Sequence, residues 1–273
     1  MYGVTEEFKQ GKINQDSCED FIVTAPNVAA VIDGATDKSG KTYAGMTSGK
    51  FAAHTIADNL PHLARNVESG TQLISKISDF LQGAITAESG EDFFTLKDTP
   101  SVCLVAYLTD LGCIVRVGDC PILINDVSYT GEKIFDRITS LARSAFLEIG
   151  FLEQAFSKQE VMQNDPGRAY IMPLLQKQYL AANNADSFLG YGVINGNPVP
   201  SKFIDVYPVE KGDTVILASD GYPELKSSLD ESEERLQQIL KEDPLFQKEF
   251  KSTKGLKDNQ LSFDDRAYLS IKI

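Results

Sequence analysis

The chain has 273 residues, of which 42% are hydrophobic and 24% are charged, as in an ordinary globular protein of one large or two small units. Its 26 lysine and arginine residues stand against 39 aspartate and glutamate residues, a net charge of −13. This charge argues against a nucleic-acid partner, and an anionic substrate would be repelled unless the site holds a cation. Because no apolar run near 18 residues and no apolar N-terminal segment occurs, we expect a cytoplasmic protein that does not contact membranes.

Cysteine and histidine offer little for a zinc site. The four cysteines form no C-x-x-C pair, and we expect buried, reduced thiols. They are Cys18, Cys103, Cys113 and Cys120. His54 and His62 lie away from any obvious site residue, so a structural or exposed role is the simpler interpretation.

Two short apolar runs near the N-terminus predict a β-hairpin. Phe21-Ile22-Val23 is followed by the turn residues 25–27 and then by residues 28–32, an apolar run that stops at Asp33-Gly34. Asp-Gly is a common turn pair, but glycine also lets a bare carbonyl approach whatever the carboxylate holds. The choice depends on whether other residues supply partners for Asp33.

Helices and strands alternate in the middle of the chain. A helix is predicted to begin at Thr47 or Ser48 and a second one to cover 71–88. Three strand candidates follow at 101–108, 113–117 and 121–124, and they should pair antiparallel.

Residues 131 to about 182 read as mainly helical, with a break at 164–167. The helical pattern of this segment is an apolar stripe formed by Ile134, Ile138, Leu141, Ala145 and Ile149. A Gly/Asn/Pro-rich stretch of turns covers 186–203.

The sheet pattern resumes in the last third. Residues 203–207 and 214–219 read as strands, and the second stops at Asp220-Gly221, so a second apolar strand ends at Asp-Gly. A charged helix (231–242) precedes a last strand over 267–273, which is entered through Asp264-Asp265.

Several acids therefore stand at strand ends, namely Asp33, Asp119, Asp220 and Asp264, while Asp16 lies just before the first strand. Clustered carboxylates repel one another and need hard cations between them. An oxygen-only ligand set favours Mg²⁺ or Mn²⁺ over Zn²⁺. Two such ions about 3.5–4 Å apart would activate a water for in-line attack on phosphorus.

These residues resemble the PPM (type 2C) metal-dependent serine/threonine phosphatases, in a divergent bacterial-type form. The resemblance is carried in order by Asn14-Gln15-Asp16, Asp33-Gly34, Gly118-Asp119, Ala218-Ser219-Asp220-Gly221 and Asp264-Asp265, and spans residues 11–273. It implies an α+β fold, a four-layer αββα sandwich of two antiparallel β-sheets flanked by helices. It also implies one domain over 1–273, with a mainly helical flap-like insertion at about 128–202.

The resemblance further implies the site and its ions. Asp33 would bridge two Mn²⁺ or Mg²⁺ ions, the Gly34 carbonyl and Asp16 would complete one side, and Asp220 and Asp264 would hold the other ion. Asp119 and Glu224 match positions that hold a third, weaker ion in some members. Asp33 and Asp220 are thus the candidate catalytic residues. The resemblance also implies a phosphorylated protein as the partner, and we expect a monomer.

Three departures from the family pattern stand out. Asp33-Gly34 is followed by Ala35-Thr36-Asp37, so the histidine that some members use as general acid is absent. Lys12 is the nearest cation to the position of the arginine that binds the substrate phosphate, and Cys120-Pro121 replaces the usual Ser-Arg.

Two functions of different classes follow from these observations. The first is hydrolysis of phosphoserine and phosphothreonine esters on proteins. The alternative is a catalytically weak, phosphatase-like binding or regulatory module, favoured by the missing histidine and opposed by the intact acids. No D-x-D, C-x5-R, G-x4-G-K-[ST] or H-E-x-x-H motif supports a different enzyme chemistry.

Overall fold

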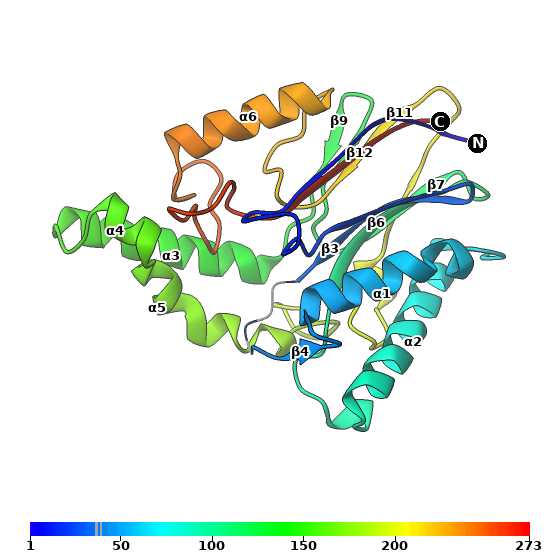
Figure 1. Cartoon of the computed structure of the whole chain (residues 1–273), viewed down its shortest axis with the longest axis horizontal. Helices are drawn as coiled ribbons and strands as arrows, with labels where there is room; N and C mark the ends of the chain where they lie inside the picture. Colours follow the sequence, from blue (N-terminus) through cyan, green and yellow to red (C-terminus); the bar gives the residue numbers. More distant parts are fainter. Residues whose placement is uncertain (36–37, 39) are drawn as a thin grey trace.

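Two five-stranded antiparallel sheets face each other between layers of helices (Figure 1). The structure is a computed structural model that describes residues 1–35, 38 and 40–273. The first sheet has the order β1 (Gly3–Gln10), β12 (Arg266–Lys272), β11 (Thr214–Ala218), β8 (Ile122–Ile124) and β9 (Val127–Tyr129). The second has the order β10 (Asp205–Pro208), β7 (Cys113–Val117), β6 (Val102–Leu108), β3 (Val28–Gly34) and β2 (Phe21–Ala25). A small hairpin joins β4 (Thr42–Tyr43) and β5 (Met46–Thr47).

Helices cover the outer face of each sheet. The pair α1 (Ser48–Leu63) and α2 (Gly70–Ser89) packs on the second sheet, and α6 (Leu229–Glu242) packs on the first. Three apolar layers result, with one between the two sheets and one under the helices on each side. The predicted αββα sandwich is therefore confirmed.

The alternation of β3 places its aspartate between the sheets. Val28, Ala30 and Ile32 pack toward α1 and α2, whereas Ala29 and Val31 pack toward the other sheet. Because side chains alternate along a strand, Asp33 falls on the same side as Ala29 and Val31.

A group of helices projects from one end of the sandwich, between β9 and β10 in the sequence (Figure 1). It contains α3 (Ile134–Leu152), α4 (Lys158–Gln163) and α5 (Pro166–Leu175). Short 3₁₀ turns are η1 (Phe93–Thr95), η2 (Gln178–Leu180) and η3 (Ser201–Phe203). The stripe that predicted α3 from its spacing is exposed, and α3 buries another face, which includes Phe135 and Leu147.

β1 was not predicted from the sequence. Its residues are mostly polar and at least partly exposed, so they show no apolar alternation, and the strand pairs only with β12 at the sheet edge. None of the helices formed by the described residues is long and apolar enough to span a membrane.

Candidate metal centre

Four strand ends bring aspartates to the same end of the two sheets. Asp33 lies on β3, Asp119 follows β7, Asp220 follows β11 and Asp264 precedes β12. All four line one cavity of about 120 Å³. The backbone N–H of Asp220 donates a hydrogen bond to Asp33 Oδ2 at 3.4 Å, across the two sheets. The structure thus gathers the strand-end acids that the sequence singled out.

The two Asp-Gly pairs are sites of close backbone approach. A Cβ on Gly34 would lie 2.6 Å from the carbonyl oxygen of Glu19 and 2.8 Å from that of Gly49. A Cβ on Gly221 would lie 2.0 Å from the carbonyl oxygen of Asp265. Only glycine fits in either place, and Gly34 lines the cavity. Gly34 also belongs to β3, so the turn interpretation of Asp33-Gly34 is wrong.

Asp20, which sequence reasoning missed, lies beside this group without lining the cavity itself. Its side chain is buried, and burial followed by the neighbouring carboxylates, including Asp264, raises its pKa well above the ordinary value. Burial likewise raises the pKa of Asp33 well above its ordinary value, and the negative charge of Asp20 is the next largest cause. In the β2–β3 hairpin Phe21 pairs with Ile32, so the next position pairs Asp20 with Asp33.

Asp16 is not part of this group. The structure leaves its side chain exposed, whereas that of Asp20 is buried, and the backbone carbonyl of Asp16 accepts a hydrogen bond from Lys50. The physical reason is its position along the chain, because Asp16 lies four residues before Asp20, in the loop that precedes β2, and so is not opposite Asp33. The two-residue turn of the hairpin was the signal that could have selected Asp20 from the sequence.

Lysines neutralise part of the acidic cluster. Lys133 Nζ lies 2.9 Å from Asp119 Oδ2 and 3.9 Å from Asp136 Oδ2. Burial alone would raise the pKa of Asp119, but the Lys133 ammonium lowers it below its ordinary value. Lys254 forms an ion pair with Asp264. Sequence reasoning did not find these cations, because no spacing rule joins them to the acids.

Lys12, predicted to bind the substrate phosphate, lies among carboxylates. Its Nζ is 3.2 Å from Asp264 Oδ1, 3.2 Å from Asp265 Oδ2 and 3.9 Å from Glu19 Oε2. Its backbone N–H also donates to Asp265 Oδ1 at 2.7 Å. These contacts tie the N-terminal loop to the start of β12.

Glu224, the other predicted ligand of a third ion, lies apart from the cavity. Its Oε2 accepts from Arg235 Nε of α6 at 2.6 Å, and Lys226 holds its other oxygen. The chain turns after Asp220-Gly221 and directs Glu224 toward α6. The structure therefore does not bring Glu224 and Asp119 together.

The acid cluster has unused capacity for cations. Within the part of the chain that the structure describes, Asp20 Oδ2 and Asp119 Oδ1 are buried without a hydrogen-bond donor. No three acidic, cysteine or histidine side chains of these residues are arranged as a finished ligand set in this conformation. Buried, mutually repelling carboxylates with orphaned oxygens nevertheless fit hard divalent ions.

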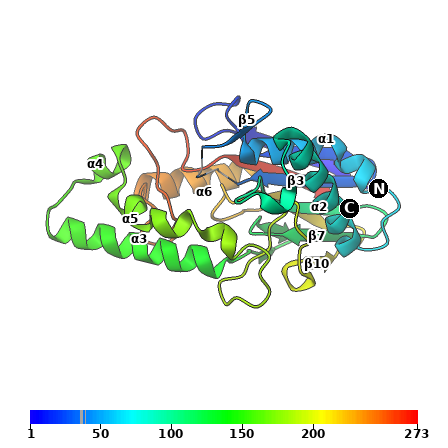
Figure 2. The ribbon, with the colours of Figure 1, turned by 90° about the horizontal axis from the view of Figure 1, so that it is seen from below.

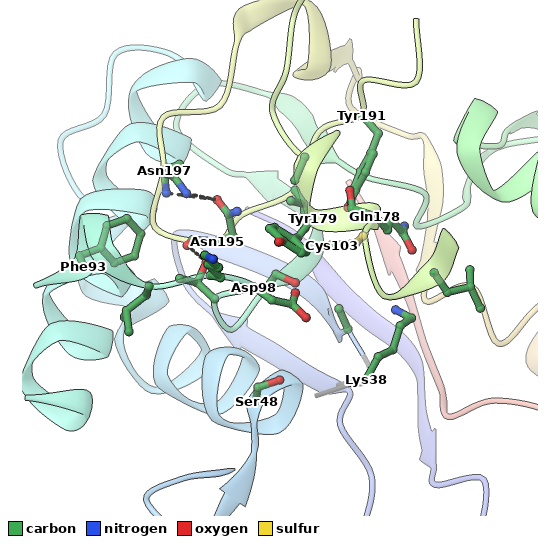
Figure 3. A pocket seen from close by; sticks show the side chains of 18 of the residues that line it. Lys38, Ser48, Phe93, Asp98, Cys103, Gln178, Tyr179, Tyr191, Asn195 and Asn197 are labelled. Atoms are coloured by element: carbon green, nitrogen blue, oxygen red, sulfur yellow. Dashed lines mark hydrogen bonds between the residues drawn. The ribbon is translucent and has the colours of Figure 1, made fainter. Parts of the chain in front are cut away.

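A second hollow of about 250 Å³ opens beside the cavity (Figure 3). Lys38 and Cys103 line both spaces. Phe93, Asn195 and Asn197 line the opposite end, where Asn197 Nδ2 donates to Asn195 Oδ1 at 3.3 Å. The hollow is thus a continuous extension of the acid-lined cavity between η1 and the segment after α5.

No histidine lines the cavity among the described residues, and both histidines of the chain lie on α1. Of the divergent stretch after Gly34, Ala35 lines the cavity, while Thr36 and Asp37 lie outside the described residues. Phe21 packs edge-on to His54, which agrees with a structural role for that residue.

Comparison with known proteins gives a consistent result. A family model for protein phosphatase 2C matches residues 5–258. The Mycobacterium tuberculosis serine/threonine phosphatase PstP/Ppp is 13% identical with a TM-score of 0.50, covering 100% of this chain and 98% of that one. The catalytic domain of PstP in complex with two manganese ions is 14% identical with a TM-score of 0.50, covering 100% and 97%. No curated protein sequence matches the chain.

Proposed function

We propose that this chain, which belongs to the protein phosphatase 2C family, holds two Mn²⁺ or Mg²⁺ ions with Asp20, Asp33, Asp220 and Asp264. Family membership makes it a metal-dependent phosphatase of phosphoserine and phosphothreonine in proteins. Two such metal ions, when bound, would lower the pKa of a water molecule and orient it for in-line attack on phosphorus. The structurally similar PstP domain carries two manganese ions.

The convergence of buried carboxylates from both sheets is the observation that carries this proposal. Asp33 takes the central position, because it lies opposite Asp20 in the register of the β2–β3 hairpin and accepts a hydrogen bond from the backbone N–H of Asp220 in the other sheet. Gly34 lines the cavity with its backbone, so its carbonyl is available as a further oxygen ligand. Since Lys133 already pairs with Asp119, two ions fit this chain better than three.

Cations around the cavity would attract the phosphate group against the net negative charge of the chain. Lys38, Lys133, Lys254 and Arg168 all line the cavity. Lys12, by contrast, is held by two aspartates, and we assign it to neutralising Asp264 and Asp265. An ammonium in a partly buried cavity interacts strongly with a phosphate oxygen, because the local dielectric is low.

In this proposal, the substrate residues on either side of the phosphorylated residue bind in the hollow beside the cavity. It begins at Lys38 and Cys103 and ends at Asn195 and Asn197, whose amides can hydrogen-bond a peptide backbone. Tyr191 adds an aromatic wall. A peptide substrate would therefore have contacts that a small aryl phosphate lacks.

Hydrolysis of p-nitrophenyl phosphate and of a phosphothreonine peptide, each with and without Mn²⁺, tests the function. We expect Mn²⁺-dependent turnover of both, abolished by Asp33→Asn or Asp220→Asn. If neither substrate is hydrolysed in a metal-dependent way, the proposal is refuted. The binding-module alternative would show phosphopeptide binding without turnover, and cleavage of the aryl phosphate alone would argue against a protein substrate.

A further inference from the structure

One face of α3 exposes a continuous row of aliphatic side chains. The exposed fractions are 44% for Ile134, 44% for Ile138, 48% for Leu141, 57% for Ile149 and 76% for Leu152. Ala145, in the middle of the row, is also exposed. We call these six residues the α3 stripe. Successive members are three or four residues apart, so they lie on one side of the helix.

The stripe lies on the side of α3 away from α5, and only Leu141 of its members also lines a hollow that α3 shares with residues 246–254. The other side packs on α5 and on the loop near Leu245, through Phe135 and Leu147. In Figure 2, α3 runs along an edge of the molecule with α5 on its inner side. The helix is thus anchored by one face and presents the other to its surroundings.

The size of the stripe indicates an interaction site. Aliphatic side chains exposed to this degree leave an apolar strip on the order of 500 Å², near the upper end for a monomeric protein. A standard interface buries about 800 Å² on each partner, which the strip and its polar borders would approach. Aliphatic residues scattered singly would need no such explanation, but a row on one helix face does.

The arrangement of the stripe is symmetric about its own centre. Ile134 pairs with Leu152, Ile138 with Ile149, and Leu141 with Ala145, and each pair is centred within one residue of position 143. Turning a second copy of the helix by 180° about an axis at this point would set each residue against its counterpart. The small Ala145 would then face Leu141, which allows close contact near the axis.

The charged borders have the same symmetry. Arg137 and Glu148 are exposed and lie eleven residues apart, which is close to three helical turns, so they flank the same side of the stripe. Their midpoint is also within one residue of position 143. A two-fold axis brings the same flank of both helices together in opposite directions, so Arg137 of each copy would face Glu148 of the other.

We propose that the chain forms a two-fold symmetric dimer in which the α3 stripes of two copies pack antiparallel. The interface is isologous, since the same patch serves both partners. This inference goes beyond the phosphatase activity and replaces the expectation of a monomer. It also makes α3, which follows the cavity residue Lys133, part of a rigid pair of helices.

The test is sedimentation equilibrium of the full chain over a roughly hundredfold range of concentration, since mass action then reveals the dimer. We expect Ile149→Asp to abolish the dimer. Arg137→Glu and Glu148→Arg should each weaken it at least about tenfold by facing like charges, and the double exchange should restore it. Arg65→Glu, an exposed change on the segment after α1, is the matched control and should leave the dimer intact. Thermal melting verifies that each variant is folded.

Each alternative outcome is informative. A wild-type chain that stays monomeric throughout, or a dimer unaffected by Ile149→Asp, would overturn the proposal. A dimer that Ile149→Asp removes but the double charge exchange fails to restore would overturn the antiparallel register. A monomer whose KM for a phosphoprotein, but not for a phosphopeptide, rises with Ile149→Asp would assign the stripe to substrate docking instead.

Discussion

Arg143 holds the projecting helices to the rest of the molecule, and its removal provides a quantitative test of the structure. Its side chain is 0% exposed, and it contacts Asp165 Oδ2 through Nε at 2.8 Å and Nη2 at 2.7 Å. Nη1 donates to the carbonyl oxygens of Leu245 at 2.8 Å and Ser252 at 3.0 Å. One guanidinium therefore joins α3, the start of α5 and the loop after α6.

We expect Arg143→Met to destabilise the protein by about 3–5 kcal/mol, the usual result of removing one partner of a buried ion pair. The side chain of Asp165, which is only 9% exposed, would lose its cation, and two backbone carbonyl groups would lose a hydrogen-bond donor. For a chain of this size the loss corresponds to a fall of roughly 10 °C in the melting temperature.

Thermal unfolding followed by circular dichroism measures the effect, and hydrogen exchange shows whether α3 to α5 open before the sandwich. Arg65→Met, at an exposed arginine, is the control and should stay within about 0.5 kcal/mol. In Arg143→Met/Asp165→Asn no buried charge remains and asparagine still caps α5, so the double variant should be more stable than Arg143→Met. A melting temperature of Arg143→Met equal to wild type would refute the reasoning.

Three further outcomes concern the metal centre. Asp20→Asn should lower Mn²⁺-dependent turnover of p-nitrophenyl phosphate at least about 100-fold, while Asp16→Asn should change it less than about twofold; equal effects would contradict the assignment of Asp20. Gly118→Ala should cost at least about 2 kcal/mol in denaturant unfolding, because φ is +94° and the new Cβ would lie 2.3 Å from Cys103 Sγ. Gly112→Ala, with φ of +59° and no close contact, should cost less. EDTA should remove turnover and Mn²⁺ should restore it, and activity that persists after exhaustive chelation would exclude the two-ion proposal.

Local sequence pattern was enough to identify most of the sandwich. The apolar runs that end at Asp33 and Asp220 are strands, and the run after Asp264-Asp265 and the hairpin around residues 25–27 behave as predicted. The reason is physical: a strand buried on both faces needs uninterrupted apolar residues, and nothing outside the segment changes that requirement. β1 was missed because an edge strand can be polar and gains its structure from β12.

The α3 stripe shows the limit of periodicity. Spacing identified a helix and an apolar face, and both are present. The spacing of the apolar residues does not show which element or partner packs against that face. α3 is instead anchored by Phe135, Leu147 and the buried Arg143, a set with a polar member that a hydrophobicity pattern overlooks.

The presence of an acidic cluster was predictable from the sequence by itself, but the tertiary structure decided which other side chains surround it. Acids at the ends of apolar strands predict clustered carboxylates, because strands of packed sheets end together. Hairpin register, which the two-residue turn sets locally, places Asp20 rather than Asp16 opposite Asp33, whereas the direction of Glu224 depends on the distant Arg235 of α6. Lys12 and Asp264 are 252 residues apart, and only packing of the N-terminal loop against β12 brings them together. Electrostatic partners across such separations leave no local pattern, because charge pairs form by proximity in space.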